Sequence, residues 1–493
     1  MVSARRRDAK MWVILAAVAA FGGSLFSGFH YDDYGMLQDT AIVSPGGWAR
    51  CWGLYQTRSL TWFTFWLNYR FAGREPLLWH TVNLALHAGC ALVLYRLLRR
   101  LLPEAALFGA LIFALHPIQS EAVDYVYARA ILLCTLFSLL ALEDWMRNRS
   151  WIAVAWFTLA ILSKEECVSV PLVLALYSMW HRQMRRRILP LAASFGIALL
   201  AGVRVIAAIE ATGMKNIGVN AGISPLGYLS EQGIAILRYF GLLVVPWLFS
   251  VDPQIPSPAF GWRLAAWAVL LGLMAAAARR FRELPPAFWI LAGLVLLIPS
   301  SSIFPAADLA ADRRMYLPML AFAPAIALLL PALRARWMVM VPCVLAVLSL
   351  GRTYVWASDE RLWSEAVELA PGKVRPTIQL SRALPPERAV TLLQDAERVA
   401  PDDPGIPTEL ARVNLELNRP SAALAEAGRA LALTPREAHA LNNRGAVLLA
   451  MNQTPAARRD FLSALDADPC LREARENLER SGGIPPDAPR CPR

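Results

Sequence analysis

The chain has 493 residues, of which 56% are hydrophobic and only 18% are charged, and its mean hydropathy is +0.40. This composition excludes a typical soluble enzyme and indicates a protein with several membrane-spanning helices. The net charge of +11 comes mostly from arginine clusters between apolar segments, and no basic stripe is interleaved with aromatic residues. Nucleic acid is therefore not an expected partner.

The first apolar segment, residues 11–28, follows a basic start that contains Arg5, Arg6 and Arg7. A cleaved signal peptide shows the same order of charged and apolar residues. We favour an uncleaved first membrane helix, because the apolar run continues to Phe29 and many further apolar segments follow.

Ten more apolar segments are candidate membrane spans, although some are shorter than the roughly 20 residues that a bilayer requires. They are residues 77–98, 104–118, 131–146, 151–163, 168–181, 188–208, 261–278, 286–300, 316–333 and 337–351. We therefore predict an all-α polytopic membrane bundle of about eleven spans. Residues 231–250 are predicted to be interfacial or re-entrant, because Pro246 interrupts them and a full span would place basic residues 279–282 outside.

The distribution of arginine predicts the orientation, since basic loops stay in the cytoplasm. The basic segments are residues 5–7, 96–100, 147–149, 181–187, 279–282 and 334–336. The extracytoplasmic segments are then residues 29–76, 116–129, 163–166, 209–260 and 304–316. We expect a cell inner membrane protein with a cytoplasmic N-terminus, and with any chemistry on the extracytoplasmic side because the cytoplasmic loops are short.

After residue 354 the sequence changes to a repeated pattern typical of tetratricopeptide units, which are helix pairs of 34 residues. Proline recurs at 401, 435 and 469, and alanine recurs in two columns, at 389, 423 and 457 and at 396, 430 and 464. Gly445 and Phe461 fit the last unit, and residues 363–371 fit a truncated leading half-unit. We expect about three repeats over residues 355–480 that bind peptide or protein, with a plain stabilising cap as the alternative. Residues 481–493 are expected to be a disordered tail.

The seven cysteines show no metal-ligand spacing. Cys90, Cys134 and Cys343 lie within apolar segments and are interpreted as small hydrophobic residues. Cys470 and Cys491 could pair outside the cell.

Two adjacent acids, Asp32 and Asp33, follow the first apolar segment directly. Adjacent residues on an irregular segment point in different directions, so we expect only one of them to face a cleft. That carboxylate could take a proton from an incoming hydroxyl, hold a divalent metal, or cap a helix.

Further ionisable side chains lie at the predicted extracytoplasmic ends of spans, where they indicate either function or mutual pairing. His80, Asn83 and His87 form one helical stripe, for which interhelical hydrogen bonding is the alternative to substrate binding. Such residues also cluster between 116 and 129, namely His116, Glu121, Asp124 and Arg129. Glu121 and Arg129 could instead form a structural ion pair.

Cations in two other segments are candidates for binding an anion. Lys164 lies beside Glu165 at the end of a span, where it suits a phosphate, although a membrane-surface anchor is the alternative. Arg313 and Arg314 lie in a predicted extracytoplasmic segment, against the usual bias, and arginine binds phosphate bidentately. Headgroup anchoring is the alternative there. The same segment contains Asp308, Asp312 and Tyr316.

These segments together resemble the transmembrane and tetratricopeptide-repeat-containing O-mannosyltransferase family. The resemblance covers nearly the whole chain through YDDYGMLQD, RSLTWFTFWLNYRFAGREPLLWHTVNLALHAGCALVLYRLLRRL, FALHPIQSEAVDYVYARAILL, LSKEECVSVPLVLALY and ADRRMYLP, followed by the repeats. It implies a GT-C membrane glycosyltransferase domain over residues 1–354, with a polyprenyl-phosphate-linked sugar as donor. The departures are Asp312, where relatives more often have glutamate, and the small number of repeats.

The resemblance implies roles for several residues. An acid of the first external loop acts as base in such enzymes, which corresponds to Asp32 or Asp33. The donor phosphate would be held by Lys164, Arg129, Arg313 and Arg314, and the substrates would be bound by His80, His116, Glu121, Glu165, Asp312 and Tyr316. No metal ligand is predicted and no cofactor is obligatory, although Mg²⁺ or Mn²⁺ stays open.

The function predicted from the sequence is transfer of a sugar, mannose if the chain follows the family, to a hydroxyl of a protein or glycan. A non-catalytic scaffold that assembles envelope proteins through its repeats is the alternative, and it predicts that Asp32, Asp33 and Lys164 are dispensable. A lipid-sugar transporter is a second rival, but it would require charges deep within several spans.

Overall fold

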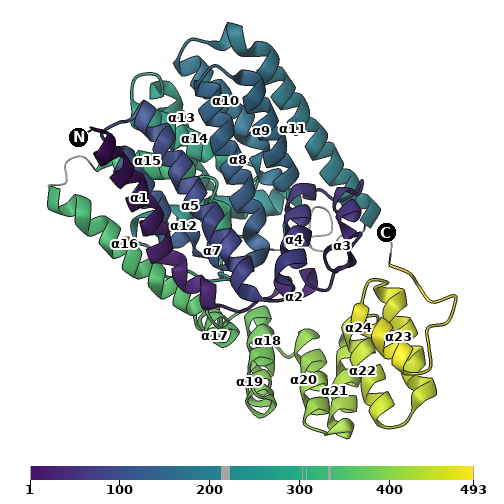
Figure 1. Cartoon of the computed structure of the whole chain (residues 1–493). Coiled ribbons are helices and arrows are strands. Elements are labelled where there is room, and N and C mark those ends of the chain that lie inside the picture. The colour runs from purple at the N-terminus through teal and green to yellow at the C-terminus, as the bar shows by residue number, and fades with distance from the viewer. Residues whose placement is uncertain (1, 213–222, 303, 307, 331–334, 492–493) are drawn as a thin grey trace. The chain divides into compact units, whose positions relative to one another are not determined.

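The computed structural model describes residues 2–212, 223–302, 304–306, 308–330 and 335–491 (Figure 1). Every regular element in these ranges is a helix, as the sequence predicts. The chain divides into two compact units, residues 1–358 and 359–493, whereas the sequence pattern places the change at residue 354.

The first unit is a bundle of apolar helices connected by shorter polar ones. Its first half contains α1 (Val2–Phe21), η1 (Gly22–Phe26), α2 (Asp32–Met36), α3 (Thr40–Val43), η2 (Gly47–Trp52), α4 (Ser59–Ala72), α5 (Pro76–Leu101), α6 (Ala106–Leu115), η3 (Pro117–Gln119), α7 (Ser120–Asp124), η4 (Val126–Ala128) and α8 (Arg129–Met146). Its second half contains α9 (Ser150–Ser163), η5 (Glu165–Ser169), α10 (Val170–Trp180), α11 (Met184–Thr212), α12 (Pro225–Val244), α13 (Phe260–Arg280), α14 (Pro285–Leu297), η7 (Asp312–Met315), α15 (Met319–Leu329) and α16 (Ala335–Trp356). Helix α1 packs against α5, α6 and α16, so the first and last long helices of this unit lie side by side (Figure 1).

Several of these helices can cross a membrane. In the described residues six are long and apolar enough, and a seventh candidate is the bent pair formed by α6 and the segment Pro117–Asp124 (η3 and α7), which meet at 51°. Helices α9, α14 and α15 are apolar but have only 10–17 residues, and at about 1.5 Å per residue they fall short of a hydrocarbon core of roughly 30 Å. The chain is thus a multi-pass membrane protein, and the difference from the predicted eleven spans lies largely in the short helices.

Helix α12 covers most of the segment predicted to be interfacial or re-entrant. It ends two residues before Pro246 and is not among the helices that can span a membrane. Two of its charged side chains are paired with other elements. Glu231 lies 2.8 Å from the guanidinium of Arg263, and Arg238 lies 2.6 Å from the carboxylate of Asp312.

The polar loops of the first unit form two separate groups. Segments predicted to be cytoplasmic meet one another through Arg96 and Arg147, which both pair with Glu143 at 2.6 and 2.7 Å, and through Arg187, which donates to Asn148 at 2.6 Å. Segments predicted to be extracytoplasmic meet one another in the same way, as the site described below shows. The structure thus keeps these two groups of segments apart, and the side of the membrane that each group faces stays a prediction from the arginine distribution.

The second unit is the predicted tetratricopeptide-repeat solenoid. It contains α17 (Asp359–Leu369), α18 (Val374–Ala383), α19 (Pro386–Val399), α20 (Gly405–Glu416), α21 (Pro420–Leu433), α22 (Ala438–Ala450), α23 (Thr454–Ala467) and α24 (Arg472–Arg480). Consecutive helices pack as pairs, and the repeated alanines at 389, 423 and 457 are fully buried at the helix contacts. Small side chains at these positions allow the helices of each pair to approach closely.

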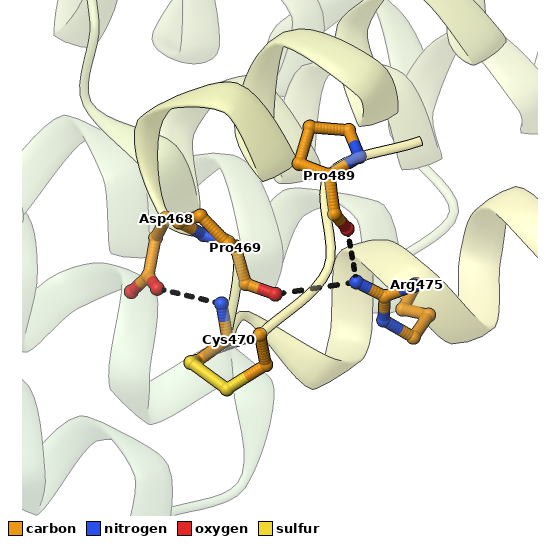
Figure 2. Close-up of a disulfide and its surroundings, with 6 residues drawn as sticks. Asp468, Pro469, Cys470, Arg475 and Pro489 are labelled. Atoms are coloured by element: carbon orange, nitrogen blue, oxygen red, sulfur yellow. Dashed lines mark hydrogen bonds between the residues drawn. A yellow bond between two sulfur atoms is a disulfide. The ribbon is translucent and has the colours of Figure 1, made fainter. Parts of the chain in front are cut away.

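The segment after α24 is folded, whereas the sequence predicts disorder for it. Ala488 is buried in the cluster that contains Leu471 and Leu478, and a disulfide joins Cys470 to Cys491. Arg475 donates to the carbonyl oxygens of Pro469 and Pro489, which holds the returning tail against the start of α24 (Figure 2). The disulfide and these contacts order a polar sequence that has too few apolar residues to order itself.

Candidate functional site

Asp33 lies in the first turn of α2 and connects two predicted extracytoplasmic segments. Its side chain is fully buried. One carboxylate oxygen accepts the backbone N–H of His30 at 3.0 Å, and the other accepts that of Tyr127 at 2.7 Å. Burial raises the pKa of Asp33 to about 7, although these two hydrogen bonds favour the ionised form.

Asp32 is exposed, unlike its neighbour. Its backbone N–H donates to the hydroxyl of Tyr125 at 3.1 Å, and the Tyr125 side chain also hydrogen-bonds to the Asp32 side chain. The preceding residue, Tyr31, has a φ of 39°. A left-handed backbone is costly for a residue with a Cβ, and such strain is often found at functional sites.

A second group of charges lies where the loop before α4 meets η5. Arg58 donates to Glu165 through Nε at 3.0 Å, and Lys164 pairs with Glu166 at 2.9 Å. Burial opposes ionisation of Glu165, but the Arg58 guanidinium outweighs it and lowers the pKa of Glu165 to about 2. Tyr127 connects this group to the acids, because its side chain interacts electrostatically with both Arg58 and Asp32.

Arg313 brings the last predicted extracytoplasmic segment to the same cluster. Its backbone N–H and its guanidinium both donate to the carboxylate of Glu121, and its guanidinium also lies 3.8 Å from Asp308. The next acid along the chain, Asp312, pairs with Arg238 of α12. Five separate segments that the sequence places on one side of the membrane therefore meet here.

Arg129 is placed deeper, at the start of α8, and is fully buried. Its guanidinium donates to the side-chain oxygens of Asn83 and Asn68 at 2.9 and 2.7 Å, and to the backbone oxygen of Trp79 at 3.1 Å. It also lies 4.9 Å from the centre of the Phe65 ring. Its donors are thus engaged within the protein, and it does not form the ion pair with Glu121 that the sequence left open.

Four other predicted site residues form contacts that hold the helices together. Arg314 donates to the hydroxyl of Tyr228 and to the backbone oxygen of Asp308. His116 accepts the N–H of Ile118 and so caps η3, and His80 contacts the oxygen of Gly28 at 3.0 Å. Tyr316 hydrogen-bonds to His87 at 2.8 Å, which places the histidine stripe of α5 in an interhelical network.

An apolar groove of about 180 Å³ begins at Glu165, the partner of Arg58, and runs between α9 and α11. Its lining is Thr57, Thr158, Ile161, Leu162, Glu165, Ile197, Leu200, Ala201, Arg204 and Val205. Arg204 donates to the backbone oxygens of Gly53, Leu54 and Gln56, and so holds the loop that carries Arg58. The groove therefore has one charged end and an apolar remainder.

Sequence reasoning missed Arg58, Tyr125, Tyr127 and Arg238. Arg58 carried a usable signal, since it is an arginine in a predicted extracytoplasmic loop, like Arg313. Tyrosines near a membrane surface are common, and only the fold brings Tyr125 to Asp32, 93 residues away in the chain.

Comparison with known proteins supports a relationship to enzymes. The family described as dolichyl-phosphate-mannose-protein mannosyltransferase matches residues 62–207. Protein O-mannosyl-transferase F38B6.6 of Caenorhabditis elegans is 27% identical over 66% of this chain and 51% of its own length. Protein O-mannosyl-transferase TMTC3 of Mus musculus is 24% identical over 86% of this chain and 54% of its own length.

These matches confirm the resemblance to the transmembrane and tetratricopeptide-repeat-containing O-mannosyltransferase family. The chain spans about half the length of the curated relatives of that family that it matches. Among solved structures, yeast Tom70 matches over 81% of this chain and 88% of its own length at 15% identity, with a TM-score of 0.25.

Proposed function

We propose that this chain is a membrane glycosyltransferase with a polyprenyl-phosphate-linked sugar as donor, mannose being the first sugar to test. The acceptor is a hydroxyl of a protein or glycan on the extracytoplasmic side of the inner membrane. The observation that carries the proposal is the clustering of Asp32, Asp33, Arg58, Lys164 and Arg313, together with an apolar groove that begins at Glu165, the partner of Arg58. The family resemblance gives the reaction class, and these residues supply groups that suit it.

The cations of the cluster suit the donor phosphate. The side chains of Arg58 and Arg313 are 30% and 29% exposed, whereas Lys164 is 6% exposed. We therefore infer that the two arginines bind the phosphate directly, and that Lys164 adds positive charge behind them. Arg129 and Arg314 contribute by holding the surrounding helices in place.

The groove suits the lipid part of the donor. An isoprenoid tail is apolar, so its phosphate must sit where the bilayer ends and charged side chains begin. The groove between α9 and α11 has this polarity, with Thr57, Glu165 and Arg204 at one end and aliphatic side chains along the rest. The tail would lie along the aliphatic part, with the phosphate near Arg58.

In the reaction, a carboxylate of the acidic pair takes the proton of the acceptor hydroxyl. The hydroxyl oxygen then bonds to the anomeric carbon of the sugar, while the bond between that carbon and the phosphate oxygen breaks. Arg58 and Arg313 stabilise the negative charge that develops on the leaving phosphate. The repeats would present the acceptor, which is the usual use of such surfaces.

The test compares envelope glycans in cells that lack the gene, and in cells restored with wild type, Asp32→Asn/Asp33→Asn or Asp39→Asn. Asp39 is a matched control, because it lies in the same segment, caps α3, and can be replaced as a cap by asparagine. We expect a glycan that disappears on deletion, returns with wild type and Asp39→Asn, and stays absent with the double variant at equal membrane abundance. Parallel assays with EDTA and with Mg²⁺ or Mn²⁺ test for a metal.

Restoration of every glycan by the double variant would contradict the proposed function. In that case the acids are not catalytic, and a scaffold that acts through its repeats becomes the better account.

A further inference from the structure

Tyr125 is the residue of the second predicted extracytoplasmic segment that contacts Asp32. Its hydroxyl oxygen accepts the backbone N–H of Asp32, and its side chain hydrogen-bonds to the Asp32 side chain. A protonated tyrosine hydroxyl can accept one hydrogen bond and donate another at the same time. The two contacts therefore fix both the backbone and the carboxylate of Asp32.

The hydroxyl of Tyr125 is itself held firmly. The ring is 5% exposed and stacks on the indole of Trp356, with ring centres 5.8 Å apart and planes at 24°. Its backbone oxygen accepts the side-chain N–H of Asn83 of α5 at 3.1 Å. Groups from α5 and α16 thus fix the position from which the hydroxyl reaches Asp32.

The two acids differ in what they can reach. Both carboxylate oxygens of Asp33 accept backbone N–H groups, and its side chain has no exposed surface. A general base must come within hydrogen-bond distance of the hydroxyl that it deprotonates. Asp32 is exposed and meets this requirement, whereas Asp33 does so only if the loop opens.

We propose that Asp32 is the base, that Asp33 anchors the loop, and that Tyr125 is a positioning residue that aims the Asp32 carboxylate at the acceptor hydroxyl. This proposal rests on the proposed transferase function. The acceptor proton passes to Asp32, the acceptor oxygen bonds to the anomeric carbon, and the electron pair of the broken bond leaves with the phosphate. Tyr125 keeps its proton throughout.

The experiment measures sugar transfer by the full chain in detergent, with polyprenyl-phosphate mannose as donor and membranes from cells lacking the gene as acceptor. The variants are Asp32→Asn, Tyr125→Phe and Tyr239→Phe. Tyr239 is the matched control, because it is fully buried in α12 and its hydroxyl contacts the backbone of Ala311 at 3.0 and 2.9 Å. Phenylalanine preserves the stacking of Tyr125 on Trp356 and removes only the hydroxyl.

We expect Asp32→Asn to lose at least about 100-fold in kcat, the usual contribution of a general base. We expect Tyr125→Phe to lose about tenfold in kcat with an unchanged KM for the donor, because misplacing a catalytic group slows the chemical step and not binding. Tyr239→Phe should match wild type in kcat.

If wild type transfers sugar but Tyr125→Phe matches Tyr239→Phe, or loses activity only through KM, this inference is overturned and the proposed function stands. If wild type transfers no sugar, the proposed function itself is contradicted, and the role of Tyr125 is contradicted with it. Should Tyr125→Phe not accumulate in membranes, a fluorinated tyrosine at position 125 keeps the ring and the hydroxyl while changing the hydrogen bond. An unchanged kcat in that variant would equally overturn the inference.

Discussion

Asp33 is a buried acid whose protonation is linked to folding. Burial raises its pKa to about 7 from the usual 3.8. Between these two pH values the folded state holds more protons than the unfolded state, so the free energy of unfolding falls as pH rises. Over about three pH units the loss is at most about 4 kcal/mol.

We therefore expect the apparent melting temperature of the wild type in detergent to fall between pH 4.5 and pH 8, relative to that of Asp33→Asn. The amide has nearly the same shape but does not titrate in this range. The measurement is a thermal melt of both proteins at several pH values. Parallel curves for the two proteins would contradict a buried, titrating Asp33.

At the scale of single residues, the sequence located the acidic pair and several cations but not their roles. Arg313 and Arg129 look alike as extracytoplasmic arginines, yet Arg313 is 29% exposed and Arg129 is fully buried among amide and carbonyl oxygens. Which arginine is engaged internally depends on Asn68 and Asn83, and sequence alone gives no sign of that contact. The exposure of each arginine could therefore be learned only from the fold.

Packing between α22 and α23 depends on a glycine. A Cβ placed on Gly445 would lie 2.5 Å from a ring atom of Phe461. We expect Gly445→Ala to lower the free energy of unfolding of the repeats by about 1–3 kcal/mol, because the phenyl ring must move in a close-packed contact. Pulse proteolysis of the full chain in urea measures this free energy.

Gly428 in α21 provides the control for that prediction. A Cβ there meets nothing within 4 Å, so Gly428→Ala should gain about 0.5–1 kcal/mol from the better helix propensity of alanine. Equal gains in both variants would mean that the helix pair tolerates the extra methyl group and that the repeat contact is loose.

At the scale of elements, periodic patterns were the most reliable guide. The proline and alanine columns predicted the repeat helices, because each column marks one contact that recurs in every unit. The apolar segments predicted most bundle helices within a few residues, as α5 and α13 show. Short helices such as α2, η2 and η4 were not predicted. They are too short to show a hydrophobic period, and caps and contacts with distant segments fix them instead.

At the scale of the whole molecule, the disulfide between Cys470 and Cys491 closes a loop across a separation of 21 residues. In the chain-entropy account, a crosslink over such a loop stabilises the fold by about 3 kcal/mol. We expect Cys470→Ser/Cys491→Ser to lower the free energy of unfolding of the repeats by this amount in pulse proteolysis. Cys343→Ser, which removes an exposed free thiol of α16, should have no effect.

A reductant provides a second route to the same comparison. Wild type treated with reductant should approach the double serine variant, and the variant itself should not respond. If the reductant changes the free energy of unfolding of neither protein, the disulfide contributes nothing to the stability of the repeats.

The disulfide between Cys470 and Cys491 also restricts the hosts in which the protein can be produced. Structural disulfides persist in the periplasm or in the secretory pathway, whereas cytosolic reductants keep thiols reduced. Correct maturation of the solenoid end would therefore depend on a host with thiol-oxidising enzymes on the side of the membrane where the repeats emerge. Expression in a strain that lacks those enzymes should yield a bundle that inserts normally but a tail around Ala488 that proteases remove.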